Sequence, residues 1–195
     1  MPTAEIVQYF ARQDRDMYLP MQVAIQCGPL LKNVKMASVM IMSRQNTRVL
    51  IKMLKGTPIS LRILYSGHRK DVVYLYREDS LTGYLNRPEI QKALQSFGYR
   101  PGSCSQILKQ LAFFAKESYA QYRRCPHEIG IFLGYPVEDV KSFVEHKGKN
   151  CLLRGYWKVY HDVACAMDTF EQYDSAKSRA VQELLQGKSI REIAC

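Results

Sequence analysis

Two prolines and one glycine divide residues 125–140 into two short helices, and this segment constrains the fold more than any other part of the chain. Pro126 and Pro136 each suit the first turn of a helix, where the missing amide hydrogen bond is not needed. Gly134 lies between them and can adopt the left-handed conformation that ends a helix. The second helix continues with apolar residues at helical spacing. We therefore expect an αα-corner at residues 126–147.

The rest of the chain alternates between helical and strand periodicity. Every second residue from Ile59 to Tyr65 is apolar or aromatic, which is the period of a strand. After a turn, residues 71–77 form a second apolar run, so the segment 58–77 predicts an antiparallel hairpin. Helices are expected near residues 3–13, 20–27, 44–55, 80–86, 88–97, 104–122, 126–133, 136–147, 161–186 and 189–194. Strands are expected near residues 37–42, 58–65, 71–77 and 151–160.

Length favours a single domain. A chain of 195 residues is long enough to bury a core of its own, and it contains no internal repeat and no low-complexity segment. The predicted fold is therefore one α+β domain over residues 1–195, with helices packed around a small, mainly antiparallel sheet.

The sequence also bears on location. No apolar run approaches the roughly 20 residues that a membrane-spanning helix needs. Residues 1–16 carry several charged side chains and do not resemble a secretory signal. The cysteines are scattered without a Cys-x-x-Cys pair, which in a chain without a secretory signal favours reduced thiols. We expect a cytoplasmic protein that makes no membrane contact.

The net charge of +10 is concentrated in the first half of the chain, where no acidic residue occurs between Asp16 and Asp71. Within this stretch Ser43 is a suitable N-cap and Gly56 a suitable C-terminal stop for a helix. Four basic residues of that helix form one stripe: Arg44, Arg48, Lys52 and Lys55. Four apolar residues form another: Val49, Leu50, Met53 and Leu54. The basic stripe is either a solvated face or an anion-binding surface.

A second candidate surface lies on the last predicted strand. One of its faces presents Arg154, Tyr156, Lys158 and Tyr160, and Trp157 belongs to the other. If the strands join one sheet, the first face lies near Tyr74 and Tyr76. Basic residues interleaved with aromatic ones can stack bases or hold phosphates. The alternative is that the tyrosines pack beneath a helix with their hydroxyls at its rim.

His127 and Glu128 are the candidate catalytic residues, because histidine titrates near neutral pH and a carboxylate could assist it. Adjacent residues on a helix point about 100° apart, however, which places the two side chains in different directions. Ile131 stands where the zinc-protease motif His-Glu-x-x-His has its second histidine, so that zinc site is excluded. No other spacing matches a metal site, and none is expected.

The corner also has the spacing of a helix-turn-helix. Its second helix begins with Glu138 and Asp139, however, and acidic residues at that position would be repelled by DNA phosphates. A DNA-binding protein therefore remains an alternative rather than the leading interpretation.

Two long motifs together resemble a bacterial family called domain of unknown function 3793. They are residues 127–136 with Asp139 and Val140, and residues 155–160. The resemblance covers nearly the whole chain, including the turn at 26–29. The family brings no established activity, cofactor or catalytic residue, so the resemblance implies none here. It does imply that the two motifs belong to one recurring unit.

These patterns lead to a preferred function and two alternatives. We expect a non-catalytic binding or regulatory protein that holds an anionic small molecule, a nucleic acid or an acidic protein. Its candidate ligand-binding residues are Arg44, Arg48, Lys52, Lys55, Arg154, Tyr156, Trp157, Lys158 and Tyr160. The alternatives are an enzyme that uses His127, Glu128, Tyr135 and Lys158 at one pocket, and a helix-turn-helix-like DNA-binding protein. The sequence specifies no cofactor and no oligomeric state.

Overall fold

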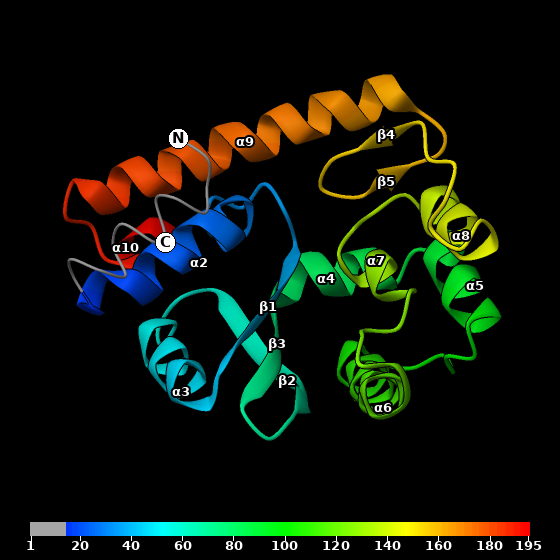
Figure 1. The fold of residues 1–195 in the computed structure, drawn as a ribbon, viewed down its shortest axis with the longest axis horizontal. Coiled ribbons are helices and arrows are strands. Elements are labelled where there is room, and N and C mark those ends of the chain that lie inside the picture. The colour runs from blue at the N-terminus through cyan, green and yellow to red at the C-terminus, as the bar shows by residue number, and fades with distance from the viewer. Residues whose placement is uncertain (1–14) are drawn as a thin grey trace.

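A computed structural model of the protein describes residues 15–195, and its centre is a three-stranded antiparallel sheet (Figure 1). The strands are β1 (Ala37–Ser43), β2 (Ile59–Ser66) and β3 (Lys70–Arg77), in the order β1-β3-β2. Strand β3 pairs with both neighbours, so Tyr74 lies opposite Val39 on one side and Arg62 on the other. The predicted hairpin at 58–77 is confirmed.

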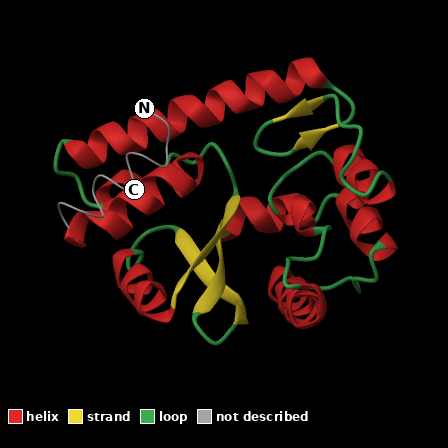
Figure 2. Cartoon of the chain, in the orientation of Figure 1, coloured by secondary structure: helices red, strands yellow, loops and turns green. Residues whose placement is uncertain are grey.

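Helices cover both faces of this sheet (Figure 2). They are α2 (Arg15–Leu31), α3 (Arg44–Met53), α4 (Glu78–Leu85), α5 (Pro88–Ser96), α6 (Cys104–Tyr122), α7 (Ile129–Phe132), α8 (Val137–Glu145), α9 (Val163–Leu185) and α10 (Ile190–Ala194). The predicted helix at 3–13 lies outside the described residues. None of the helices within residues 15–195 is long and apolar enough to cross a membrane.

The two faces of β3 lie in two different cores, because successive side chains of a strand point in opposite directions. Val73 and Leu75 pack against α2, α3, α9 and α10, whereas Val72 and Tyr74 pack among helices α4 to α8. Burial on both faces explains why β3 is almost continuously apolar. The predicted α+β domain, with helices packed around a small antiparallel sheet, is confirmed.

The αα-corner is present, with α7 and α8 joined by a turn at Gly134. This glycine has a φ of +78°, in the left-handed region that was expected for it. The first helix begins later than predicted, at Ile129, because residues 127–128 form a turn instead. Gly130 allows α7 to approach α8 closely, since a Cβ atom there would lie 2.8 Å from Cγ2 of Val140.

The single strand predicted at 151–160 is wrong. The segment is a two-stranded hairpin, β4 (Leu153–Arg154) and β5 (Lys158–Val159), and it is separate from the central sheet. At the turn between the two strands, Gly155 donates a backbone hydrogen bond to Trp157 O at 3.0 Å. The ring of Phe170 on α9 occupies the space that a side chain at position 155 would need. The close packing of α9 thus explains the glycine at this turn.

Two smaller predictions also need correction. The strict alternation expected along β2 breaks at a register shift between Ile63 and Tyr65, which exposes Ile63 and buries Leu64. On α3, Val49 of the predicted apolar stripe is exposed, and Thr47 is buried instead. The hydroxyl of Thr47 donates to Ser43 O at 3.2 Å, so its polar atom is satisfied inside the helix.

Candidate functional site

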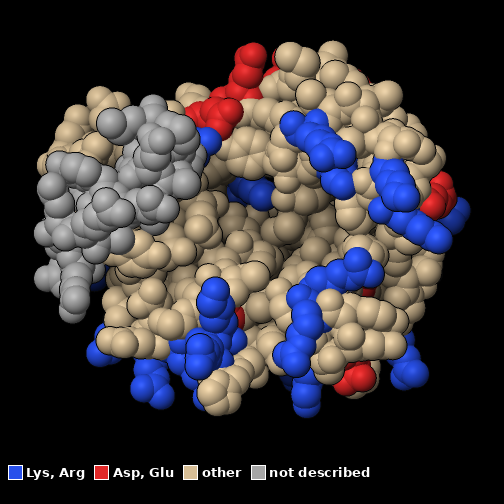
Figure 3. Space-filling view, in the orientation of Figure 1, with Lys and Arg blue, Asp and Glu red and all other residues tan. Residues whose placement is uncertain are grey.

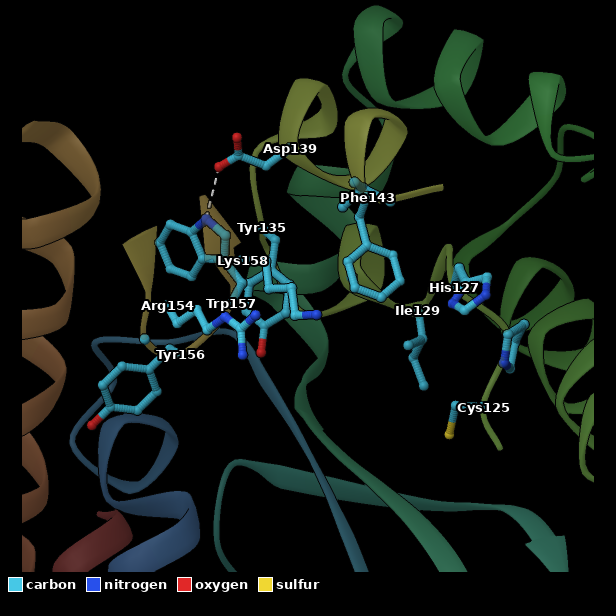
Figure 4. A pocket seen from close by; sticks show the side chains of 14 residues that line it. Cys125, His127, Ile129, Tyr135, Asp139, Phe143, Arg154, Tyr156, Trp157 and Lys158 are labelled. Carbon is cyan, nitrogen blue, oxygen red and sulfur yellow. Dashed lines mark hydrogen bonds between the residues drawn. The ribbon is translucent and has the colours of Figure 1, made fainter. Parts of the chain in front are cut away.

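A pocket of about 490 Å³ lies between the αα-corner and the β4–β5 hairpin, and Figure 4 shows it from close by. Its volume is within the range of roughly 300–1,000 Å³ that is typical of small-molecule sites. The corner and the segment before it contribute Cys125, Pro126, His127, Ile129, Gly130, Tyr135, Asp139, Val140 and Phe143. The hairpin contributes Arg154, Gly155, Tyr156, Trp157 and Lys158. We call this cavity the aromatic pocket.

Asp139 joins the two sides of the aromatic pocket. Its Oδ2 atom accepts a hydrogen bond from Nε1 of Trp157 at 2.8 Å, as drawn in Figure 4. Its Oδ1 atom accepts from the backbone amides of Tyr160 at 2.8 Å and His161 at 3.1 Å. Asp139 is 3% exposed, so these three donors replace the water that its carboxylate would otherwise bind. Asp139 therefore holds the hairpin against α8.

Aromatic rings form the walls of the pocket. The ring of Trp157 stacks on Tyr135 with centroids 5.1 Å apart and meets the edge of Phe170 at 4.5 Å. On the opposite wall, His127 and Phe143 lie 5.1 Å apart. Rings that are fixed by such contacts are preorganised surfaces against which a planar, apolar group can pack.

Two cations border the same space. The ammonium group of Lys158 donates to Gly148 O at 2.6 Å and lies 5.4 Å from the centre of the Phe143 ring. Arg154 is exposed, and its guanidinium forms no hydrogen bond or ion pair with another described residue. Figure 4 shows the head groups of Arg154 and Lys158 near the middle of the pocket. Because Asp139 is already occupied by three donors, the pocket favours an anion over a cation.

The proposed acid–base pair is not brought together. His127 lines the aromatic pocket, and its pKa is lowered by burial and by the nearby Arg124 guanidinium. Glu128 does not line the pocket but accepts a hydrogen bond from the Tyr99 hydroxyl at 3.1 Å. Burial raises the pKa of Glu128, although the hydrogen bonds from its own backbone amide and from Tyr99 oppose that rise. The two side chains serve different parts of the fold, although residues 127–128 form a turn and not the helix from which their separation was predicted.

Four of the predicted ligand-binding residues on the hairpin line the aromatic pocket: Arg154, Tyr156, Trp157 and Lys158. Tyr160 does not, because its ring stacks on His146 at 5.5 Å. The expected neighbourhood with Tyr74 and Tyr76 is wrong. Tyr74 is fully buried in the central sheet, where its hydroxyl donates to Phe132 O at 2.7 Å.

The basic stripe lies elsewhere. Arg44, Arg48 and Lys52 are on the exposed side of α3, and Lys55 follows the end of that helix. In Figure 1, α3 and the β4–β5 hairpin are on opposite sides of the molecule. Arg44 lies 3.8 Å from the carboxylate of Asp71 and donates to Gly67 O at 2.8 Å. The stripe and the aromatic pocket are therefore separate surfaces.

Sequence reasoning missed two important residues of the pocket. Asp139 was interpreted as an acidic residue at a helix start, and Phe143 as an ordinary apolar position. The signal that could have identified Asp139 was the link between its motif and the motif that contains Trp157, because a buried carboxylate needs hydrogen-bond donors. Across residues 15–195, no group of three or more histidine, cysteine, aspartate or glutamate side chains gathers in a metal-binding arrangement.

Comparison with known proteins identifies one family. The family model described as "Protein of unknown function (DUF3793)" matches residues 23–194. No curated protein and no solved structure matches the chain.

Proposed function

The chain belongs to the DUF3793 family of proteins of unknown function, and we propose that it is a cytoplasmic binding or regulatory protein for a small anionic ligand. The ligand has a planar or aromatic body, which occupies the aromatic pocket. One observation carries this proposal: three hydrogen-bond donors already occupy the carboxylate on the pocket wall, while Arg154 remains unpaired among the described residues.

The two parts of such a ligand have different partners. Its ring would pack against Trp157 and Phe143, which are already held in place by neighbouring rings. Its carboxylate or phosphate would face Arg154 and Lys158 at the hairpin. A neutral ligand could use the aromatic walls alone, so the anionic group is the more specific part of the proposal.

Intrinsic fluorescence provides a direct test, because Trp157 is the only tryptophan in the chain. Nucleoside monophosphates and aromatic carboxylates are titrated at physiological salt while the Trp157 emission is recorded. Replacing Arg154→Gln should weaken binding about tenfold, the loss expected for one hydrogen bond to a charged group. Lys149→Gln is the matched control, because Lys149 is exposed and lies outside the pocket lining, and its replacement also removes one positive charge. An affinity that is the same in both variants would contradict the proposal.

An enzyme remains the second candidate, because His127, Tyr135 and Lys158 line one pocket. The lowered pKa of His127 keeps its imidazole neutral near neutral pH, as a general base requires. His127→Gln distinguishes the two functions. Either function keeps most of the ligand affinity in this variant. Turnover of the ligand separates them: an enzyme shows turnover that His127→Gln removes, whereas a binding protein shows no turnover in either form.

A further inference from the structure

Lys35 is a buried cation that forms no ion pair with any residue the structure describes. It lies between α2 and β1, and only 9% of its surface is exposed. No carboxylate within residues 15–195 forms an ion pair with it. Its ammonium group instead faces two aromatic rings, Tyr135 at 5.1 Å and Tyr173 at 5.5 Å. Burial of a charge is costly unless the charge is paired, so cation–π contacts alone leave much of that cost uncompensated.

A second cavity, of about 390 Å³, opens beside this lysine. We call it the Lys35 cavity, and it is lined by Ile25, Gln26, Lys35, Ser38, Val39, Leu133, Tyr135, Tyr156 and Lys177. Figure 3 shows a hollow near the centre of this face of the molecule, with a basic side chain at its floor. Tyr135 and Tyr156 line both this cavity and the aromatic pocket, so the two spaces adjoin.

The nearby titratable groups do not neutralise Lys35. Burial raises the pKa of the Cys27 thiol to about 12, so Cys27 carries no charge near neutral pH. Burial likewise raises the pKa of Tyr135, Tyr156 and Tyr173, which therefore remain neutral phenols. Lys177 adds a second positive charge at the wall, although its ammonium group is paired with Asp174 and lies near the Tyr156 hydroxyl.

Lys35 itself remains mostly charged under ordinary conditions. Burial lowers its pKa from 10.5 to about 8, against a small opposing effect of Cys27. A protonated lysine in a cavity without a carboxylate attracts an anion from solution. The hydroxyl of Ser38 and the amide of Gln26 line the same cavity and can donate further hydrogen bonds.

We propose that the Lys35 cavity is a second binding site, which takes a small oxyanion, a carboxylate or a phosphate, with Lys35 as its anchor. The proposal does not depend on a ligand in the aromatic pocket, although the two spaces share Tyr135 and Tyr156. Its occupant supplies the negative charge that the described part of the chain does not place beside this lysine.

The first test follows Lys35 in the unmodified protein. Nuclear magnetic resonance of isotope-labelled lysine reports the pKa of its ammonium group while acetate or inorganic phosphate is added in separate titrations. A bound oxyanion should raise that pKa from about 8 toward the ordinary lysine value, because it stabilises the charged form. A pKa that does not move in either titration would overturn the proposal. A shift with only one of the two anions identifies the preferred oxyanion.

The second test uses a charge-matched pair of variants. Lys35→Met keeps most of the length of the side chain and removes its charge, and it should weaken oxyanion binding about tenfold or more. Lys32→Met removes the same charge from a residue that pairs with Glu183 outside the cavity, and it should bind like the unmodified protein. Equal affinity in Lys35→Met and Lys32→Met would also overturn the proposal. If the Lys35 proposal fails these tests, the proposed function of the aromatic pocket still stands, because that function is tested separately by Trp157 emission and Arg154→Gln.

Discussion

Nε1 of Trp157 donates a hydrogen bond to Oδ2 of Asp139 at 2.8 Å, and this contact fastens the β4–β5 hairpin to helix α8. Both residues also line the aromatic pocket, so the same bond sets the position of its central ring. Because the carboxylate is buried, the bond cannot be replaced by one to bulk water.

Removal of either partner should loosen the hairpin. Trp157→Phe and Asp139→Asn should each lower the free energy of unfolding by about 2 kcal/mol, since each leaves a buried polar group without its partner. The double variant should cost less than the sum of the two single changes. Urea unfolding followed by circular dichroism measures all three values. Glu145→Gln, an exposed change on the same helix, is the control, and full additivity would contradict the coupling.

Gly155 should not tolerate a side chain. In Gly155→Ala the added methyl group would overlap the ring of Phe170, so the hairpin must move away from α9. We expect a loss of about 1–3 kcal/mol in the free energy of unfolding. Gly83→Ala is the matched control, because no atom lies within 4 Å of the added methyl group and alanine favours a helix. Adding Phe170→Leu to Gly155→Ala should recover part of the lost free energy of unfolding. If nothing is recovered, the destabilisation does not come from a clash with the Phe170 ring.

The buried charge of Lys35 predicts a pH dependence of stability. Its pKa is about 8 in the folded protein and near 10.5 when unfolded, so the unfolded chain binds more protons between these values. The free energy of unfolding therefore rises with pH across this window. Below about pH 8 Lys35 is charged in both states, and the full cost of burying its charge lowers the stability of the fold. Lys35→Met lacks this titration. It should be more stable than the unmodified protein by about 2 kcal/mol near neutral pH, with a gap that closes on the alkaline side.

Measurement of both proteins by urea unfolding at a series of pH values gives this difference directly. The groups around Lys35, namely Cys27, Tyr135, Tyr156, Tyr173 and Lys177, are the same in both proteins, so their own titration largely cancels. A gap that stays constant or widens with rising pH would contradict the assignment of a buried, uncompensated ammonium group.

The basic stripe on α3 should not contribute to the aromatic pocket. Replacement of Arg48 and Lys52 by glutamate reverses two exposed charges on the opposite side of the molecule. At physiological salt such charges are screened beyond about 8 Å, so affinity for the pocket ligand should change less than about twofold. Fluorescence titration of Trp157 measures this. A large loss of affinity would mean that the two surfaces act together after all.

Local sequence signals accounted for much of the fold. The helix predicted at 104–122 has the same bounds as α6, because Ser103 and Gln106 form a capping box at its start. The turn at Gly134 follows in the same way from a residue that readily adopts positive φ. Such features depend on neighbours in the chain and are therefore visible without a structure.

The aromatic pocket depended on contacts between distant residues. The alternation at residues 151–160 predicted one strand, because nothing local reveals that the chain turns at Gly155, where Phe170 packs against it. The sequence did not distinguish Lys35 from the other basic residues between Asp16 and Asp71, since lysine is rarely buried. Its environment is created by Tyr135 and Tyr173, which are far from it in sequence. Asp139 likewise acquires its role only when the hairpin folds back onto α8.

Comparison of matched anionic and neutral ligands tests the central claim most directly. Trp157 emission is recorded during titration with adenosine monophosphate and adenosine, and with benzoate and its amide. The anionic member of at least one pair should bind about tenfold more tightly, and Arg154→Gln should remove most of that preference. Equal affinity for the charged and neutral members of both pairs, or no binding of any of the four compounds, would contradict an anion-binding aromatic pocket.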